Sequence, residues 1–87
     1  MNIFVTGANR GIGLEFVRQL TTRGETVLAS CRHPEKANDL KSLLSEGRII
    51  PIDVTIQDSI VQGAKVVRKK FDRIDLLINN AGVMGER

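Results

Sequence analysis

The sequence contains no tryptophan, no tyrosine and a single cysteine. Cys31 cannot form a disulfide within the chain, so we expect the protein to work in a reducing compartment such as the cytoplasm. No apolar run approaches the ~18 residues that a membrane-spanning helix needs, so we expect no membrane partner. Residues 1–7 carry no basic segment before their short apolar run, so we expect no secretory signal.

The chain is short and weakly charged. Its 87 residues, of which 41% are hydrophobic, predict one small folded domain rather than a disordered chain. The net charge is only +3, and we interpret the basic run Arg68-Lys69-Lys70 as the solvated face of a helix. Sites for single-stranded nucleic acid combine basic residues with stacking aromatic side chains. Because the chain has only three phenylalanines, we expect no nucleic-acid partner.

Short apolar runs alternate with segments whose apolar residues recur at helical spacing. Pro34 suits the first turn of the second helix, and Thr55 with Asp58 resembles a capping box that opens the third. Gly63, inside the third helix, indicates close packing. The expected strands are residues 3–5, 26–30, 49–52 and 74–79, and the expected helices are residues 11–22, about 34–46 and about 55–71.

The strands are apolar on both faces, which predicts a parallel sheet covered on both sides. Right-handed crossovers then give an α/β fold with a Rossmann-type sheet, β-α-β-α-β-α-β, in strand order 3-2-1-4. Pro51 agrees with an outer position for the third strand, because proline cannot donate a ladder hydrogen bond. The fourth strand, Leu76-Leu77-Ile78, would be the other edge with nothing beside it. An open apolar edge invites association, so we expect this to be the front portion of a larger sheet.

The turn between the first strand and the first helix is rich in glycine. Its sequence, Thr6-Gly7-Ala8-Asn9-Arg10-Gly11-Ile12-Gly13, spaces the glycines as G-x-x-x-G-x-G. A glycine at a strand end permits a tight turn. Glycines at a helix start let backbone amides approach a pyrophosphate and let the helix lie close to the sheet. An ordinary glycine-rich turn would also fit, but this one lies after the first strand, where a phosphate-binding loop belongs.

A second candidate feature follows the second strand. NAD sites usually place a carboxylate here, which binds the ribose 2′-OH. This chain has Cys31-Arg32-His33 instead, and no carboxylate before Glu35. A guanidinium binds phosphate oxygens in pairs, so Arg32, with Arg10 from the glycine turn, favours NADP(H) over NAD(H). The alternative for Arg32 is a solvated loop residue. We interpret Cys31 as a lining residue rather than a nucleophile, and His33 as a loop histidine.

Two further polar features follow the third and fourth strands. Asp53, followed by Val54, would lie at the C-terminal edge of the sheet, where its carboxylate could accept a hydrogen bond from an adenine amino group. The alternative for Asp53 is a turn or a cap. The run Asn79-Asn80-Ala81-Gly82 has amides that can join strand ends and small residues that leave room for a ribose or an adenine. Taken alone, this run is a turn signal.

These four features, in this order over residues 3–82, resemble the short-chain dehydrogenase/reductase family, and the flanking residues are most similar to its sniffer, C-factor and carbonyl-reductase branch. The resemblance implies that the glycines and Ile12 form the pyrophosphate turn, that the arginines select NADP, and that Asp53 and Val54 contact the adenine. Asn80, Ala81 and Gly82 would stabilise the sheet and line the adenosine. The implied cofactor site is Gly7, Asn9, Arg10, Gly11, Ile12, Gly13, Arg32, Asp53, Val54, Asn80, Ala81 and Gly82.

The family's catalytic residues have no counterpart in the chain. Family members use a tyrosine as general acid/base, a lysine four residues later, an upstream serine and an asparagine on a later helix. We therefore assign no catalytic residue and no metal site. We expect residues 1–87 to be the truncated NADP-binding half of a Rossmann domain, with the catalytic and substrate-binding part absent. The parent would reduce a carbonyl by hydride transfer, and the segment alone would be inactive without a general acid.

Two alternatives stay open. The segment could be a non-enzymatic module that binds a nucleotide or caps its open strand edge on a partner chain. It could also be too small to fold stably, because about half of the sheet is absent. The helices through which family members usually dimerise are absent too, so self-association would have to use the exposed edge of the fourth strand.

Overall fold

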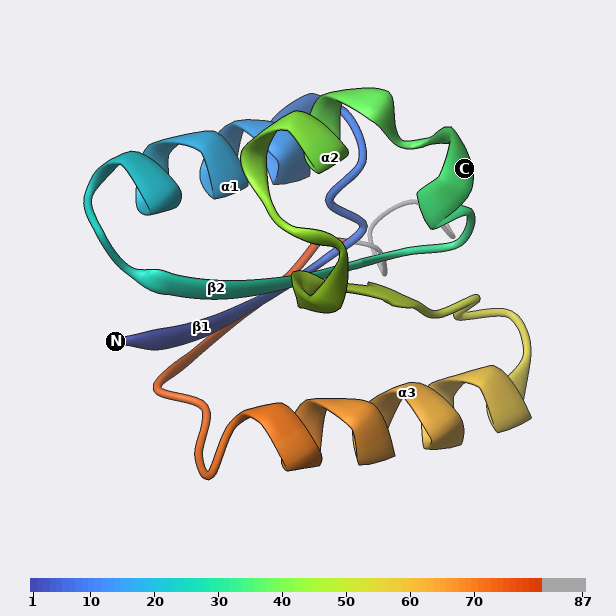
Figure 1. The fold of residues 1–87 in the computed structure, drawn as a ribbon. Helices are drawn as coiled ribbons and strands as arrows, with labels where there is room; N and C mark the ends of the chain where they lie inside the picture. The colour runs from blue at the N-terminus through green and yellow to red at the C-terminus, as the bar shows by residue number, and fades with distance from the viewer. Residues whose placement is uncertain (81–87) are drawn as a thin grey trace.

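The protein forms a four-stranded parallel sheet with helices on both faces (Figure 1). The structure is a computed structural model, and it describes residues 1–80. The strand order β3-β2-β1-β4 confirms the predicted α/β sheet. No helix in the described part is long and apolar enough to cross a membrane. The elements are β1 (Asn2–Thr6), α1 (Gly11–Thr22), β2 (Thr26–Cys31), the 3₁₀ turn η1 (Pro34–Lys36), α2 (Asn38–Leu43), the 3₁₀ turn η2 (Glu46–Arg48), β3 (Ile49–Pro51), α3 (Gln57–Lys70) and β4 (Leu76–Asn79).

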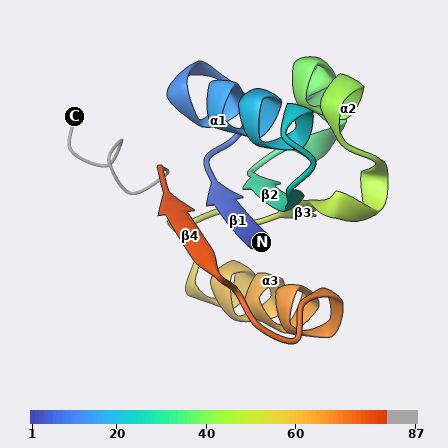
Figure 2. The same cartoon turned by 90° about the vertical axis from the view of Figure 1, so that its left-hand side faces the viewer.

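The two faces of the sheet carry unequal cores. Figure 2 shows α1 and α2 on one face and α3 on the other. Because successive strand residues point to opposite faces, Ile3 and Val5 pack toward α1 and α2, whereas Phe4 packs toward α3. The α1–α2 core contains twelve buried residues. The α3 core contains only five, which are Phe4, Leu28, Ile50, Val67 and Phe71.

The second helical segment is shorter than its spacing predicts. In place of one helix over about 34–46, the chain forms η1, the six-residue α2 and η2. The backbone leaves the helical conformation at Ala37 (φ −92°, ψ 65°) and at Leu44 (φ −130°, ψ 146°). Both side chains are buried, as is Leu40 between them. The apolar positions that indicated one long helix are therefore buried by turning the backbone at each end of a short one.

The start of α3 also differs from the prediction. Ile56 is the N-cap residue and no side chain caps the helix, so the predicted capping box at Thr55 is wrong. The Thr55 hydroxyl and amide instead donate to Asp53 Oδ1, at 2.6 and 3.0 Å, because this carboxylate lies only two residues away. The predicted close packing at Gly63 is confirmed, since a Cβ there would lie 2.3 Å from Ile52 Cγ1.

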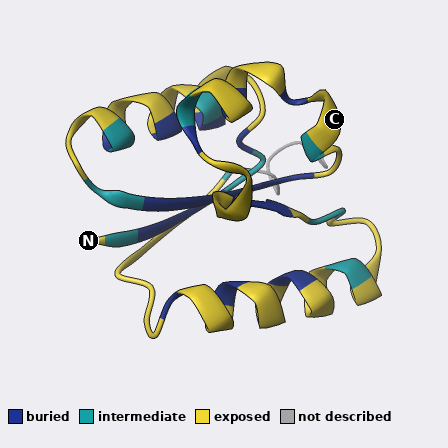
Figure 3. Ribbon diagram, in the orientation of Figure 1, coloured by how far each residue is buried: buried dark blue, intermediate teal, exposed yellow. Residues whose placement is uncertain are grey.

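β4 is the least covered strand of the sheet. Its Leu76 and Leu77 are 41% and 55% exposed. Within residues 1–80 it pairs only with β1. Figure 3 shows the contrast between β2, which is mostly buried, and β4, which is mostly exposed. This agrees with the uncovered apolar edge that the sequence predicts.

Candidate functional site

The segments that follow the four strands all leave the sheet at the C-terminal ends of the strands. We call this end of the sheet the site edge, as distinct from the lateral edge that β4 forms. All strands are parallel, and the pairing places Val5 of β1 opposite both Ala29 of β2 and Ile78 of β4. Cys31, the last residue of β2, pairs with Pro51 of β3. The carboxyl ends of neighbouring parallel strands therefore meet here, where open α/β folds bind ligands. The predicted cofactor-binding residues up to Asn80 all lie in these segments, whereas Ala81 and Gly82 lie outside the described residues.

The glycine turn requires glycine for two different reasons. Gly7 and Gly11 both have a φ of 61°, in the left-handed region that favours glycine. At Gly13 the reason is space, because a Cβ would lie 2.4 Å from the Gly7 carbonyl oxygen and 2.9 Å from Asn80 Nδ2. The start of α1 is thus packed directly against the end of β1. This agrees with the close helix–strand approach that the glycine spacing predicts.

Side-chain amides at the end of β4 bind the end of β1 and the glycine turn. Asn80 Nδ2 donates to the Gly7 carbonyl oxygen at 3.0 Å. The Thr6 hydroxyl donates to Asn79 Oδ1 at 2.9 Å. Both bonds join the end of β1 to the end of β4, residues 73 positions apart in the chain. The prediction that these amides join strand ends is confirmed.

The N-terminus of α1 reaches the site edge without a side-chain cap. Arg10 is the N-cap residue, makes no capping hydrogen bond, and no acidic residue lies in the first turn. The first amides of a helix have no partner within it, and the helix dipole adds partial positive charge there. Asn9 and Arg10 are exposed, and Ile12 is 68% exposed. This helix start therefore suits a phosphate group.

Arg32 and Asp53 lie at the neighbouring ends of β2 and β3. The Thr55 hydroxyl and amide donate to the Asp53 carboxylate and hold its pKa below the usual value. The nearby positive charges of Arg32 and, when protonated, His33 act on this pKa in the same direction. Arg32 itself is exposed. The site edge therefore places an exposed guanidinium near a carboxylate that is ionised at neutral pH.

Two residues that we did not assign from the sequence orient Asp53. One is Thr55, whose two hydrogen bonds engage Oδ1. The other is Ser59 in the first turn of α3, whose hydroxyl oxygen accepts a hydrogen bond from the Asp53 amide at 2.8 Å. The Asp-x-Thr spacing is typical of an Asx turn and could have indicated Thr55. Only the docking of α3 reveals Ser59. Val54, between these partners, is 49% exposed at the edge.

Cys31 and His33 flank Arg32 and differ in exposure. Cys31 is 3% exposed and belongs to the α1–α2 core, and burial raises the pKa of its thiol. A buried neutral thiol packs rather than attacks, which agrees with the interpretation of Cys31 as a non-nucleophilic residue. The exposed His33 has Nδ1 at 3.5 Å from Glu35 Oε2, as expected of a loop histidine.

Comparison with known proteins agrees with this geometry. The family model described as short chain dehydrogenase matches residues 1–87. The chain belongs to the short-chain dehydrogenase family. One relative of this short-chain dehydrogenase is oxidoreductase BOA17 of Botryotinia fuckeliana, 38% identical over 81 residues that cover 91% of this chain and 30% of that protein. The chain spans 28–33% of the length of the first curated relatives that it matches.

Solved structures of other proteins share the fold of this short-chain dehydrogenase. The Sniffer protein of Caenorhabditis elegans, described as a carbonyl reductase, superposes with a TM-score of 0.83 at 40% identity, covering 92% of this chain and 36% of that one. A metagenomic short-chain oxidoreductase in complex with NADP has a TM-score of 0.78 at 32% identity, covering 93% of this chain and 38% of that one. The family consists of oxidoreductases that bind nicotinamide cofactors.

Proposed function

We propose that the segment binds the adenosine diphosphate part of NADP(H) at the site edge. The observation that carries this proposal is the uncapped start of α1, packed on the glycine turn, with Arg10 exposed beside it. The backbone amides and the dipole of α1 would hold the pyrophosphate. The absence of a Cβ at Gly13 lets this helix start lie against Gly7. The NADP complex of the metagenomic relative supports the assignment.

The preference for NADP(H) over NAD(H) rests on charge at the end of β2. Arg10 and Arg32 are exposed, and neither belongs to an ion pair within residues 1–80. The residue that ends β2 is the buried thiol of Cys31, so no carboxylate is present there to accept a hydrogen bond from a ribose 2′-OH. A planar guanidinium instead matches the oxygens of a 2′-phosphate. Both arginines would therefore read that phosphate.

Asp53 and Val54 would contact the adenine. Thr55 engages one carboxylate oxygen and Ser59 engages the Asp53 amide, so the orientation of Asp53 does not depend on the ligand. The ionised carboxylate would accept a hydrogen bond from the adenine amino group. Asn80 would line the adenosine together with Ala81 and Gly82, and Asn9 would complete the site at the glycine turn.

The whole protein is proposed to reduce a carbonyl, as a member of the sniffer, C-factor and carbonyl-reductase branch. The 40% identity to Sniffer supports this branch. The nicotinamide cofactor would supply the hydride, and residues 1–87 would bind and orient it. We assign no catalytic residue here, because the 87 residues contain no tyrosine to protonate the developing alkoxide. We therefore propose that this segment alone is inactive.

Titration calorimetry with NADP⁺ and NAD⁺ tests the proposed site. We expect saturable binding with tighter affinity for NADP⁺. Arg32→Ala should weaken NADP⁺ binding by about 1.5–3 kcal/mol, roughly 10–150-fold, and NAD⁺ binding far less. The control Arg23→Ala removes the same charge at the opposite end of α1 and should change neither affinity. Equal losses for both cofactors would show that Arg32 does not read the 2′-phosphate, and no heat from a chain folded by circular dichroism would refute the site.

A second candidate function is favoured by the exposed β4 edge. Leu76 and Leu77 are 41% and 55% exposed. An open strand edge can pair with another strand, and the same edge of a second copy offers matching donors and acceptors about a twofold axis. As the alternative we therefore propose an interaction module that self-associates through β4. Sedimentation velocity should then show concentration-dependent dimers that Leu77→Lys abolishes, and dimers unaffected by Leu77→Lys would exclude this edge.

A further inference from the structure

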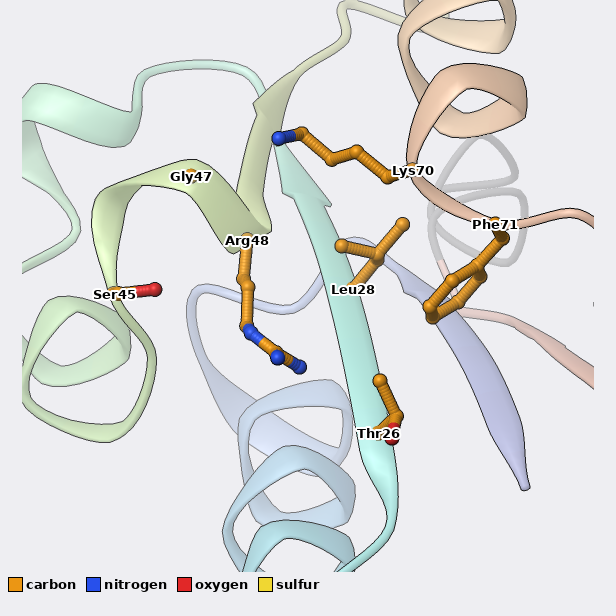
Figure 4. A pocket seen from close by; sticks show the side chains of 7 residues that line it. All are labelled: Thr26, Leu28, Ser45, Gly47, Arg48, Lys70 and Phe71. Carbon is orange, nitrogen blue, oxygen red and sulfur yellow. The ribbon is translucent and has the colours of Figure 1, made fainter.

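A hollow lies at the N-terminal ends of the strands, opposite the site edge. It is formed where β2 and β3 begin, between η2 and the last turn of α3 (Figure 4). Its volume is about 320 Å³, within the range of small-molecule sites. Because the strands are parallel, their starts are separated from their ends by the length of the sheet, so this hollow is distinct from the proposed nucleotide site. The side chains that line it are Thr26, Leu28, Ser45, Arg48, Lys70 and Phe71.

Two cations border this hollow, and neither has an anionic partner within residues 1–80. In Figure 4, Arg48 extends from η2 toward Thr26, and Lys70 extends from the end of α3 toward Gly47. The Lys70 ammonium lies against that loop, since a Cβ built at Gly47 would be 3.7 Å from Nζ. None of the ion pairs found within residues 1–80 includes Arg48 or Lys70. The two charged groups extend in different directions in Figure 4, and together they give the hollow a positive potential that attracts an anion.

The remaining lining residues define the shape of a matching ligand. Leu28 and Phe71 belong to the α3 core, are 2% and 7% exposed, and form an apolar floor. Thr26 and Ser45 add hydroxyl groups at the side of the hollow. An oxyanion would therefore meet cations and hydroxyl donors, while a compact apolar group attached to it would lie on the floor.

We propose that this hollow is a second binding site, which takes a small organic phosphate monoester. The Arg48 guanidinium would bind two phosphate oxygens and the Lys70 ammonium would act as a point charge on the phosphate. The ester's apolar part would contact Phe71 and Leu28. The proposal does not depend on nucleotide binding, because none of these residues lies at the site edge.

Phenyl phosphate is the probe that tests this site, with backbone amide resonances of the chain followed by NMR. We expect saturable shifts around Arg48 and Phe71, with affinity about 5-fold or more above that for inorganic phosphate, which lacks the apolar group. Phenol, which lacks the anion, should not saturate the site. Shifts of equal size and affinity with inorganic phosphate would overturn the role of the apolar floor.

Charge variants separate this site from general attraction to a basic chain. Arg48→Gln and Lys70→Gln should each weaken phenyl phosphate binding about 5-fold or more, because each removes a charged partner. Lys65→Gln, an exposed residue of the same helix that does not line the hollow, removes the same charge and should have no effect. Equal weakening by Lys65→Gln would overturn the proposal, as would the absence of saturable shifts up to about 10 mM ligand. Well-dispersed spectra of each variant verify that it is folded.

Discussion

β2 and β4 both lie beside β1 and are both rich in apolar residues, yet they are covered to very different extents. In β2, Val27 and Leu28 are 0% and 2% exposed, whereas in β4 Leu76 and Leu77 are 41% and 55% exposed. β2 has β3 as a further neighbour and packed cores on both faces. β4 pairs only with β1 within residues 1–80. An apolar strand is therefore buried only where the fold supplies neighbours for it.

The two cores of the sheet also differ in how many residues they bury. Twelve buried residues lie under α1 and α2, and five lie under α3. Because hydrophobic stabilisation grows with the apolar area removed from water, we expect most of the stability to come from β1, β2 and the α1–α2 side. Regions with few buried contacts open first, so we expect β4 to open before β2.

Truncation of one leucine in each strand should give the largest contrast. Leu28→Ala leaves a cavity in the α3 core and should lower the free energy of unfolding by about 2–5 kcal/mol. Leu77→Ala removes a side chain that is 55% exposed and should lower it by less than about 1 kcal/mol. Urea unfolding followed by circular dichroism measures both. Equal losses would mean that β4 is as well covered as β2.

Thiol labelling compares how accessible the two strands are in the folded chain. Cys31 is buried and its pKa is raised by burial, so it should react slowly with an aromatic disulfide reagent at neutral pH. A Leu77→Cys thiol, placed in a Cys31→Ser background, should react about 100-fold faster or more. Both thiols should react at similar rates in concentrated urea, which serves as the control. Similar rates under native conditions would show that the Cys31 thiol is as accessible as a thiol at position 77.

Gly63 tests how tightly α3 is held against the sheet. Gly63→Ala adds a Cβ that would lie 2.3 Å from Ile52 Cγ1. The gain in helix propensity, about 1 kcal/mol, should be outweighed by an overpacking cost of about 1–3 kcal/mol, so we expect a modest net loss of stability. Gln62→Ala, on the exposed side of α3, is the matched control and should not destabilise. A more stable Gly63→Ala variant would show that α3 moves away from Ile52 at little cost.

The smallest expected effect is a pH dependence at the start of β4. The Asn2 amide donates to Asp75 Oδ2 at 2.8 Å, which lowers the pKa of Asp75 below 3.8, and Arg73 lowers it further. The folded pKa lies below the unfolded one, so the stabilisation is fully present above about pH 4 and is lost as the pH falls through the folded pKa. Asp75→Asn should therefore reduce the acid dependence of the urea midpoint. If the urea midpoint of Asp75→Asn falls with decreasing pH as it does in the unmodified chain, other carboxylates cause that dependence.

Much of the sheet was predictable from local patterns. Apolar runs bounded by turn residues placed all four strands, and the right-handed crossover then limited their order to β3-β2-β1-β4. The glycine spacing likewise predicted the turn at Gly7 and Gly11, because only glycine adopts a φ of 61° at little cost. The amides after β4 were also predicted to join strand ends, and Asn80 does so.

The errors arose where two local signals competed. The spacing from Ala37 to Leu44 fits a helix, but the chain buries both residues by turning the backbone outside the short α2. Thr55 can cap a helix or bond to a nearby carboxylate, and Asp53 is the nearer acceptor. Spacing alone does not decide between such alternatives, because either conformation buries the same apolar side chains or uses the same hydrogen-bonding group.

The sequence by itself determined the alternation of strands and helices, the glycine turn and the absence of a carboxylate after β2, because these depend on backbone preferences and residue identity. Only the tertiary structure decided which side chains of different elements meet. The packing of α3 brings Ser59 to the amide of Asp53, and the end of α3 lies near η2, so that Arg48 and Lys70 border one hollow. These placements depend on how α3 packs against the sheet, which local residue preferences do not set.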